Sequence, residues 1–166
     1  MKVCIDVKMR ADYIYDLLLF HMYSKFSGFL INLIGLTVIM LSGLWLRWGK
    51  LTLTQTLAYM GVGVVVLIFT PLSLKIKAKK MMEDSKFQSV IQYGFDETGI
   101  EEQLSDHMIR YSWGQIEKAI ATPKDIAFYL NGSQVLIMPK EQFKDNFMPV
   151  MQLIAQNLTR DKIYIR

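Results

Sequence analysis

The sequence has a single cysteine and almost no charge in one long stretch. One cysteine, Cys4, excludes an intrachain disulfide, and we expect it to be a small buried side chain. Between residues 28 and 74 the only charged residues are Arg47 and Lys50. Residues 89–166 carry eight Lys/Arg against ten Asp/Glu, so the net charge of +4 comes from residues 1–27, from the loop with Arg47 and Lys50, and from residues 75–88. A basic face on a folded domain is not expected, which argues against nucleic-acid binding.

Catalytic and metal-binding motifs are also missing. The two histidines, His21 and His107, have no second ligand at metal spacing. No Gly-x-Ser-x-Gly turn and no phosphate-binding signature occurs in the chain. Glu101 and Glu102 are neighbours on a predicted strand, so their side chains point to opposite faces and cannot act together on one bond. We therefore expect no enzyme activity, no cofactor and no metal site.

Two apolar runs occupy the uncharged stretch. Residues 28–46 (GFLINLIGLTVIMLSGLWL) form an uncharged run of nineteen residues, and residues 57–74 (LAYMGVGVVVLIFTPLSL) form one of eighteen. At ~1.5 Å per residue each helix would span about 27–28 Å, close to the ~30 Å of a bilayer core. The lengths predict two transmembrane helices joined by a short loop as a hairpin. The N-terminal residues do not have the pattern of a cleavable signal peptide.

Basic residues predict how this hairpin is oriented. A lysine cluster follows the second run directly and comprises Lys75, Lys77, Lys79 and Lys80. Together with basic residues before the first run, the cluster outnumbers Arg47 and Lys50 in the loop. The positive-inside rule therefore predicts a multi-pass membrane protein with both termini cytoplasmic. The cluster is also a candidate site for anionic head groups, at roughly 1 kcal/mol per lysine, and a phosphoinositide-type site is the narrower alternative.

Small residues predict where the two membrane helices touch. The candidate packing residues are Gly28, Asn32, Gly35, Ser42, Ala58 and Gly61. The two glycines and the serine of the first run recur every seven residues, and we expect their shared face to meet the second run. Asn32 is the one strongly polar residue deep in a run, and it predicts a hydrogen bond between the helices rather than an ion path.

Short strands and turns dominate the segments outside the apolar runs. Residues 1–27 contain a half-buried strand over 2–8 and then a juxtamembrane helix, while residues 75–88 form a basic linker. Strands are expected at 89–96, 100–104, 107–113, 116–121, 125–130 and 133–138. The last two flank Asn131-Gly132, which indicates a tight hairpin. The N-terminal strand has room to join this sheet, because both termini are predicted on one side of the membrane.

The C-terminal end of the chain has helical spacing. A short helix is expected from Pro139 to Asp145 and a second one capped by Asn146, with a last strand over 161–166. The predicted fold class is an α+β membrane protein: a two-helix transmembrane hairpin with a cytoplasmic antiparallel sheet closed by a C-terminal helix. A pleckstrin-homology-like roll has this arrangement, but the pattern alone does not distinguish it from other sheet-plus-helix folds.

Several motifs resemble those of the YcxB-like bacterial membrane proteins. They are Tyr93-Gly94-Phe95, Glu97-x-Gly99-Ile100, Trp113-x-x-Ile116 and Ile137-Met138-Pro139-Lys140-x-x-Phe143, in this order. Met138 departs from the aliphatic residue expected there. The resemblance implies a protein of the bacterial inner membrane with a pleckstrin-homology-like domain over residues 89–166, and it brings no catalytic residue to this chain.

The motif residues also have structural interpretations of their own. We expect Trp113 and Ile116 to be buried against the sheet. Gly94 and Gly99 are expected at a bulge and a turn, and Pro139 at the junction between strand and helix.

Three functions remain open at this point. The first is a membrane-anchored interaction module that binds a protein or peptide partner through a strand edge or groove. The second is a sensor of anionic membrane lipids that acts through the lysine cluster. The third is an inner-membrane immunity protein that neutralises a toxin. Assembly into a homo-oligomer is open in each case.

Overall fold

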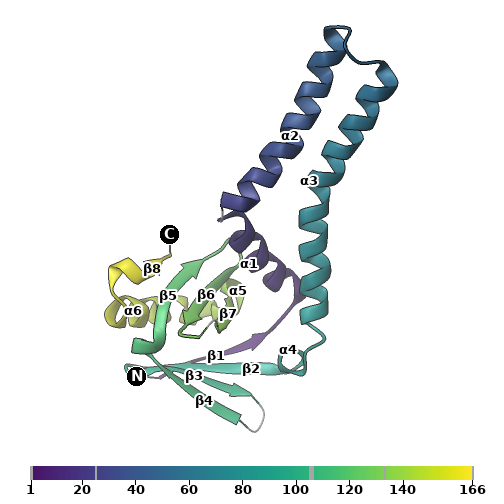
Figure 1. Ribbon diagram of the computed structural model, residues 1–166. Coiled ribbons are helices and arrows are strands. Elements are labelled where there is room, and N and C mark those ends of the chain that lie inside the picture. The colour runs from purple at the N-terminus through teal and green to yellow at the C-terminus, as the bar shows by residue number, and fades with distance from the viewer. Residues whose placement is uncertain (1, 25, 105–106, 133, 166) are drawn as a thin grey trace. The chain divides into compact units, whose positions relative to one another are not determined.

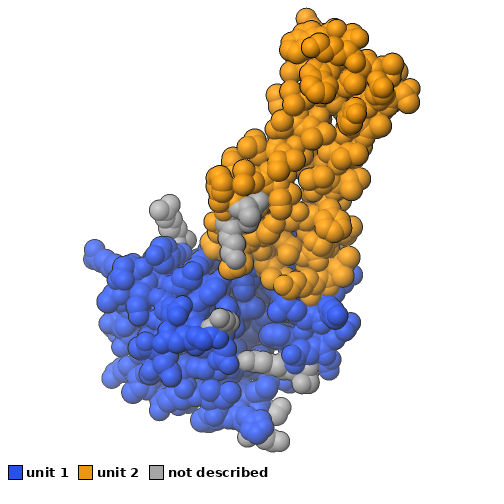
Figure 2. Space-filling model, in the orientation of Figure 1, with its two compact units in different colours: residues 1–17, 78–166 blue, residues 18–77 orange. Residues whose placement is uncertain are grey.

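The chain folds into an α+β structure with two compact units. The computed structural model describes residues 2–24, 26–104, 107–132 and 134–165. One unit, here the sheet unit, contains residues 1–17 and 78–166, and the other, the helical unit, contains residues 18–77 (Figure 2). The predicted turn at 105–106 and the first residue of the strand predicted over 133–138 lie outside the described residues.

The first sheet contains the N-terminal strand. It has four antiparallel strands in the order β1-β2-β3-β4, namely β1 Val3–Lys8, β2 Val90–Phe95, β3 Gly99–Leu104 and β4 His107–Ser112 (Figure 1). β1 pairs with β2 from Val3↔Phe95 to Lys8↔Val90. Every second residue of β1 is buried, which confirms the predicted half-buried strand. The prediction for Cys4 is wrong, since the alternation places its side chain on the exposed face.

The second sheet has the order β7-β6-β5-β8. Its strands are β5 Ile116–Ala121, β6 Asp125–Leu130, β7 Val135–Pro139 and β8 Ile163–Tyr164. The short β8 runs parallel to β5, and the other pairs are antiparallel. The bulge predicted at Gly94 is absent, because Gly94 pairs in regular register with Cys4 and Glu101. The register shift lies instead in β5, between Ile116 and Lys118.

Short helices complete the sheet unit. They are α4 Ser85–Gln88, η1 Trp113–Gln115, α5 Lys140–Phe143, η2 Lys144–Asn146, α6 Phe147–Asn157 and η3 Arg160–Lys162. The division of the C-terminal helical segment at Asn146 is confirmed, with Pro149 in the first turn of α6. Asn146 makes no side-chain capping bond; its amide instead donates to Cys4 O at 3.0 Å.

Aromatic rings join the two sheets in one core. The centroid of the Phe95 ring in β2 lies 6.1 Å from the centroid of the Phe128 ring in β6 and 6.5 Å from that of the Phe143 ring in α5. α6 buries Val150 and Ile154 completely. Residues that are distant in sequence therefore form one continuous core, and this core positions the two outer edges of the first sheet.

The helical unit contains two long apolar helices. α1 Ala11–Tyr23 ends in this unit, α2 Phe26–Arg47 lies within it, and α3 Leu53–Met81 begins in it. α2 and α3 are long and apolar enough to cross a membrane. Only 11% and 6% of their most apolar stretches are buried.

Candidate functional site

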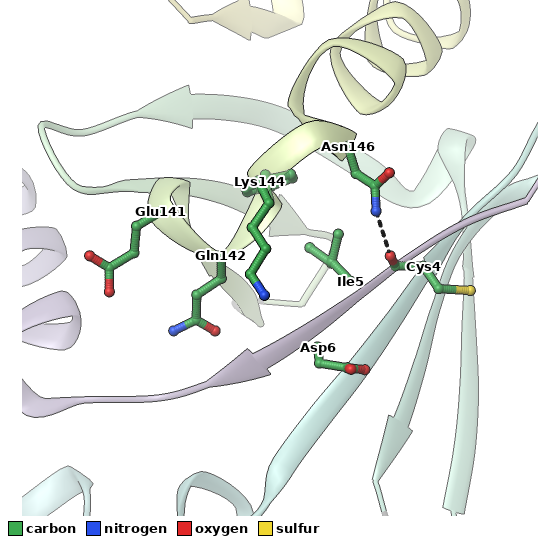
Figure 3. A pocket seen from close by; sticks show the side chains of 8 residues that line it. Cys4, Ile5, Asp6, Glu141, Gln142, Lys144 and Asn146 are labelled. Carbon is green, nitrogen blue, oxygen red and sulfur yellow. Dashed lines mark hydrogen bonds between the residues drawn. The ribbon is translucent and has the colours of Figure 1, made fainter.

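A polar pocket of about 440 Å³ lies along the outer edge of β1 (Figure 3). Its lining includes the side chains of Cys4, Asp6, Glu141, Gln142, Lys144 and Asn146. Figure 3 shows the Lys144 amine extending from the α5–α6 connection towards β1. The pocket therefore lies between the N-terminal strand and the C-terminal helical segment.

Side-chain amides cover the backbone of β1 at this pocket. Gln142 accepts from Lys8 N at 2.7 Å and donates to Lys8 O at 2.8 Å. Asn146 donates to Cys4 O at 3.0 Å. Because backbone groups alternate along a strand, residues Cys4, Asp6 and Lys8 present their N–H and C=O groups to this outer edge. The two amides bracket the edge and make it a poor template for another strand.

The connection that carries Asn146 is strained at Lys144. This residue has φ 47° and ψ −126°, a conformation that favours glycine and costs of order 1–3 kcal/mol. The reversal at Lys144 lets η2 turn back towards β1, where Asn146 makes its contact with Cys4.

The opposite edge of the same sheet is open. β4 is the last strand in the order β1-β2-β3-β4, and among the described residues no further strand pairs with it. Four consecutive residues, His107 to Arg110, are exposed. Met108 and Ile109 are 62% and 48% exposed, which is unusual for large apolar side chains on a strand edge.

A buried carboxylate lies within the first sheet. Glu102 is 1% exposed and accepts hydrogen bonds from Tyr93 OH at 3.1 Å and Tyr111 OH at 3.0 Å. Burial, together with the negative charge of Glu102, raises the pKa of Tyr111 to about 12 and also raises the pKa of Tyr93. Glu101 lies on the other face and pairs with Arg110 at 3.2 Å. The prediction that the two glutamates point apart is confirmed.

A second buried carboxyl lies where α1 meets the β5–β6 turn. Asp125 is completely buried, and neither side-chain oxygen has a hydrogen-bond partner among the described residues. Asp16 of α1 accepts from Lys124 N at 3.1 Å, and Asp12 accepts from Lys124 Nζ at 3.3 Å. Lys140 Nζ, on the side of α5, donates to Thr122 O at 2.6 Å.

These neighbours set the protonation of Asp125. Burial is the main reason that its pKa is raised to about 7, and the charges of Asp16 and Asp12 raise it further. Lys124 and Lys140 act in the opposite direction. Sequence reasoning missed this group, because an aspartate after a Pro-Lys turn has the pattern of an ordinary exposed turn residue.

The lysine cluster lies at the C-terminal end of α3. All four of its residues, Lys75, Lys77, Lys79 and Lys80, are exposed. They continue the same helix that carries the second apolar run, so the positive charge begins without a break in the helix.

The contact between α2 and α3 differs in part from the prediction. Gly35 and Ser42 are buried as expected. The partner on α3 is Gly63, not Gly61: a Cβ added at Gly63 would lie 2.9 Å from Gly35 O. Gly61 has open space around it, and Ala58 is exposed. Both lie on the part of α3 turned away from the contact.

Two further packing predictions for α2 are wrong. Gly28 is buried, but against the end of α1, where a Cβ would lie 2.3 Å from Met22 O. Asn32 donates to Gly28 O in its own helix at 3.1 Å, not to the neighbouring helix. The carbonyl one turn earlier is within reach of the amide, so it satisfies the donor locally.

The motif residues have the expected structural roles, apart from the absent bulge. Trp113 and Ile116 are buried, and Trp113 Nε1 donates to Asp96 O at 3.0 Å. Gly99 follows the β2–β3 turn, and a Cβ there would lie 2.0 Å from a backbone oxygen of β4. Pro139 ends β7 and precedes α5. Tyr93 and Phe143 are also in the core.

The arrangement defines a class of protein with two long apolar helices inserted between the first strand and the remainder of an antiparallel sheet unit. The family model described as YcxB-like protein matches residues 95–148, roughly a third of the chain, from the end of β2 into α6. The chain therefore contains a YcxB-like segment, and the predicted resemblance is confirmed there. No curated protein and no solved structure matches the chain. Within the described ranges, no three His, Cys, Asp or Glu residues could hold a metal ion.

Proposed function

We propose that the chain is a membrane-anchored interaction module that binds a protein or peptide partner along the outer edge of β4. The observation that carries this proposal is the contrast between the two edges of the first sheet. Gln142 and Asn146 cover the edge of β1, whereas β4 exposes Met108 and Ile109. Addition of a partner strand would give hydrogen-bond partners to backbone groups on the outer edge of β4 and would cover these side chains.

The membrane anchor in this proposal is the hairpin of α2 and α3. Their length, apolar composition and low burial support insertion into the bilayer. The lysine cluster at the end of α3 supports a cytoplasmic location of both termini. Two sheets around one core with the C-terminal α6 support a pleckstrin-homology-like roll as the fold of the sheet unit.

Site-specific photo-crosslinking in living cells tests the proposal. A photoreactive residue at Met108 in the full-length protein is expected to give a discrete protein adduct. The same residue at Asp6 is the matched control, because it is exposed on the covered β1 edge. The second variant Ile109→Lys is expected to remove the Met108 adduct, because a charge at the pairing edge opposes strand addition.

Four possible results of this experiment are informative. An adduct of twice the chain mass identifies the partner as a second copy of the protein. Equal adducts from Met108 and Asp6, or no adduct at Met108, would contradict binding through β4. An adduct at Met108 that persists in Ile109→Lys would place the partner outside the strand edge.

A second function, anionic-lipid sensing, is favoured by the exposed lysine cluster. Its positive charges lie at the end of an apolar helix, where the surface of an anionic bilayer would attract them. Binding of the full-length protein to vesicles should then increase with anionic lipid and decrease with salt. Equal binding to neutral vesicles would exclude this function.

A further inference from the structure

The helical unit contains an apolar groove of about 420 Å³ near the end of α1. Met22 of α1, Ile31 of α2 and a stripe of α3 from Val65 to Leu74 line it. Met22, Ile31, Val66 and Leu74 are half-buried within the groove, while the Phe69 side chain is largely exposed. The stripe rises about 14 Å along α3, at ~1.5 Å per residue.

The groove follows from how the helices touch. α2 and α3 approach closely at Gly35 and Gly63, where added Cβ atoms would lie within 3.3 Å of the opposite backbone oxygen. Nearer the C-terminal end of α3, the groove is lined by larger side chains, among them Ile31 and Leu74. The elongated apolar shape suits a single hydrocarbon chain.

A lysine continues the face of α3 that lines the groove. Steps of four residues lead from Phe69 to Ser73 and then to Lys77, about 6 Å beyond Ser73. Lys75 is only two residues away but points to nearly the opposite side of the helix, because each residue turns the helix by about 100°. The lysine cluster therefore divides into two faces, and Lys77 belongs to the groove.

We propose that the groove is a binding site for an anionic phospholipid. One acyl chain lies along Ile31, Val66 and Leu74, and the ammonium group of Lys77 binds the head-group phosphate. The two parts match the two ends of such a lipid: the groove has an almost wholly apolar lining, and its helix continues into exposed positive charge. This site rests on the membrane insertion proposed above.

Native mass spectrometry of the full-length protein in detergent tests the site. Phosphatidylglycerol and phosphatidylcholine with identical acyl chains are the probes. The protein is expected to retain more phosphatidylglycerol, and Lys77→Gln to reduce that retention about fivefold, the equivalent of ~1 kcal/mol for one lysine. Lys75→Gln is the matched control, because it removes the same charge from the other face and should change retention less than about twofold.

A groove-filling variant tests the chain-binding part. Val66→Phe is expected to lower retention of both lipids, because the larger ring occupies the groove. Equal retention of the two lipids, or equal losses from Lys77→Gln and Lys75→Gln, would overturn the site.

Cell fractionation separates failure of the site from failure of insertion. Recovery of the protein in the aqueous fraction without detergent would contradict insertion itself. A protein that stays in alkali-washed membranes, but whose lipid retention does not depend on Lys77, would contradict only the lipid site.

Discussion

Replacement of Asp125 by asparagine should change how the stability of the protein depends on pH. The carboxyl is completely buried without a partner among the described residues, and its pKa is raised from 3.8 to about 7. Between these pH values the folded protein keeps a proton that the unfolded chain has lost. The stabilisation from this proton is therefore fully present below about pH 4 and is lost as the pH rises towards and through 7.

The magnitude follows from the difference of about three pH units. At about 1.36 kcal/mol per unit, the free energy of unfolding should fall by about 4 kcal/mol over this range through Asp125 alone. That is a large part of the ~5–15 kcal/mol that stabilises a typical domain. Asparagine has nearly the same shape and no charge, so Asp125→Asn should lack this dependence. The variant should gain about 4 kcal/mol relative to the wild type between about pH 4 and pH 8.

Chemical unfolding in detergent, followed by near-ultraviolet circular dichroism, measures this difference at several pH values. Asp16→Asn is a second variant, because removal of the α1 charge with the larger effect on Asp125 should lower the pKa of Asp125 and move the loss of stability towards lower pH. A constant difference between the wild type and Asp125→Asn at all pH values would refute the reasoning, since Asp125 would then not titrate in this range.

Further predictions concern two glycines that lie against a neighbouring backbone and one glutamine that covers a strand edge. Gly63→Leu should separate α2 from α3 and lower the midpoint of helix unfolding by circular dichroism, whereas Gly61→Leu, with open space around it, should not; equal effects would contradict the contact. Gly99→Ala should cost about 2 kcal/mol or more in urea unfolding, because its Cβ meets the Tyr111 carbonyl, and an unchanged midpoint would show that the strands can separate. Gln142→Ala should expose the β1 edge and speed aggregation in light scattering; an unchanged rate would mean that the amide does not protect the strand.

Local patterns account for the correct part of the fold prediction. The two apolar helices follow from uncharged runs long enough to span a bilayer, and the short strands follow from alternation interrupted by turns. The break before α6 follows from the position of Pro149, because the first turn is where a helix accommodates proline without losing a hydrogen bond. Each of these features depends on residues close together in the chain, so the sequence displays it directly.

The errors arose where the outcome depends on which neighbour a residue meets. Cys4 alternates with buried residues and is therefore exposed, although cysteine is usually buried. The Asn32 amide donates to a carbonyl of its own helix and therefore does not need a partner on the neighbouring helix. Gly61 and Gly63 are the same residue type in similar apolar surroundings in the sequence. Only the packing of the two helices places Gly63 at the contact.

The amino-acid order alone determined that this chain has two long apolar helices, short strands around them and a YcxB-like segment. Only the tertiary structure decided that β1 pairs with β2, although the two apolar helices separate these strands in the sequence. It also decided that one edge of this sheet is covered and the other open, and that Asp125 is buried beside α1. The physical reason is how far apart in the sequence the interacting residues lie. Helix and strand formation depend on side chains a few positions apart, whereas edges, grooves and buried charges exist only after segments distant in sequence have packed together.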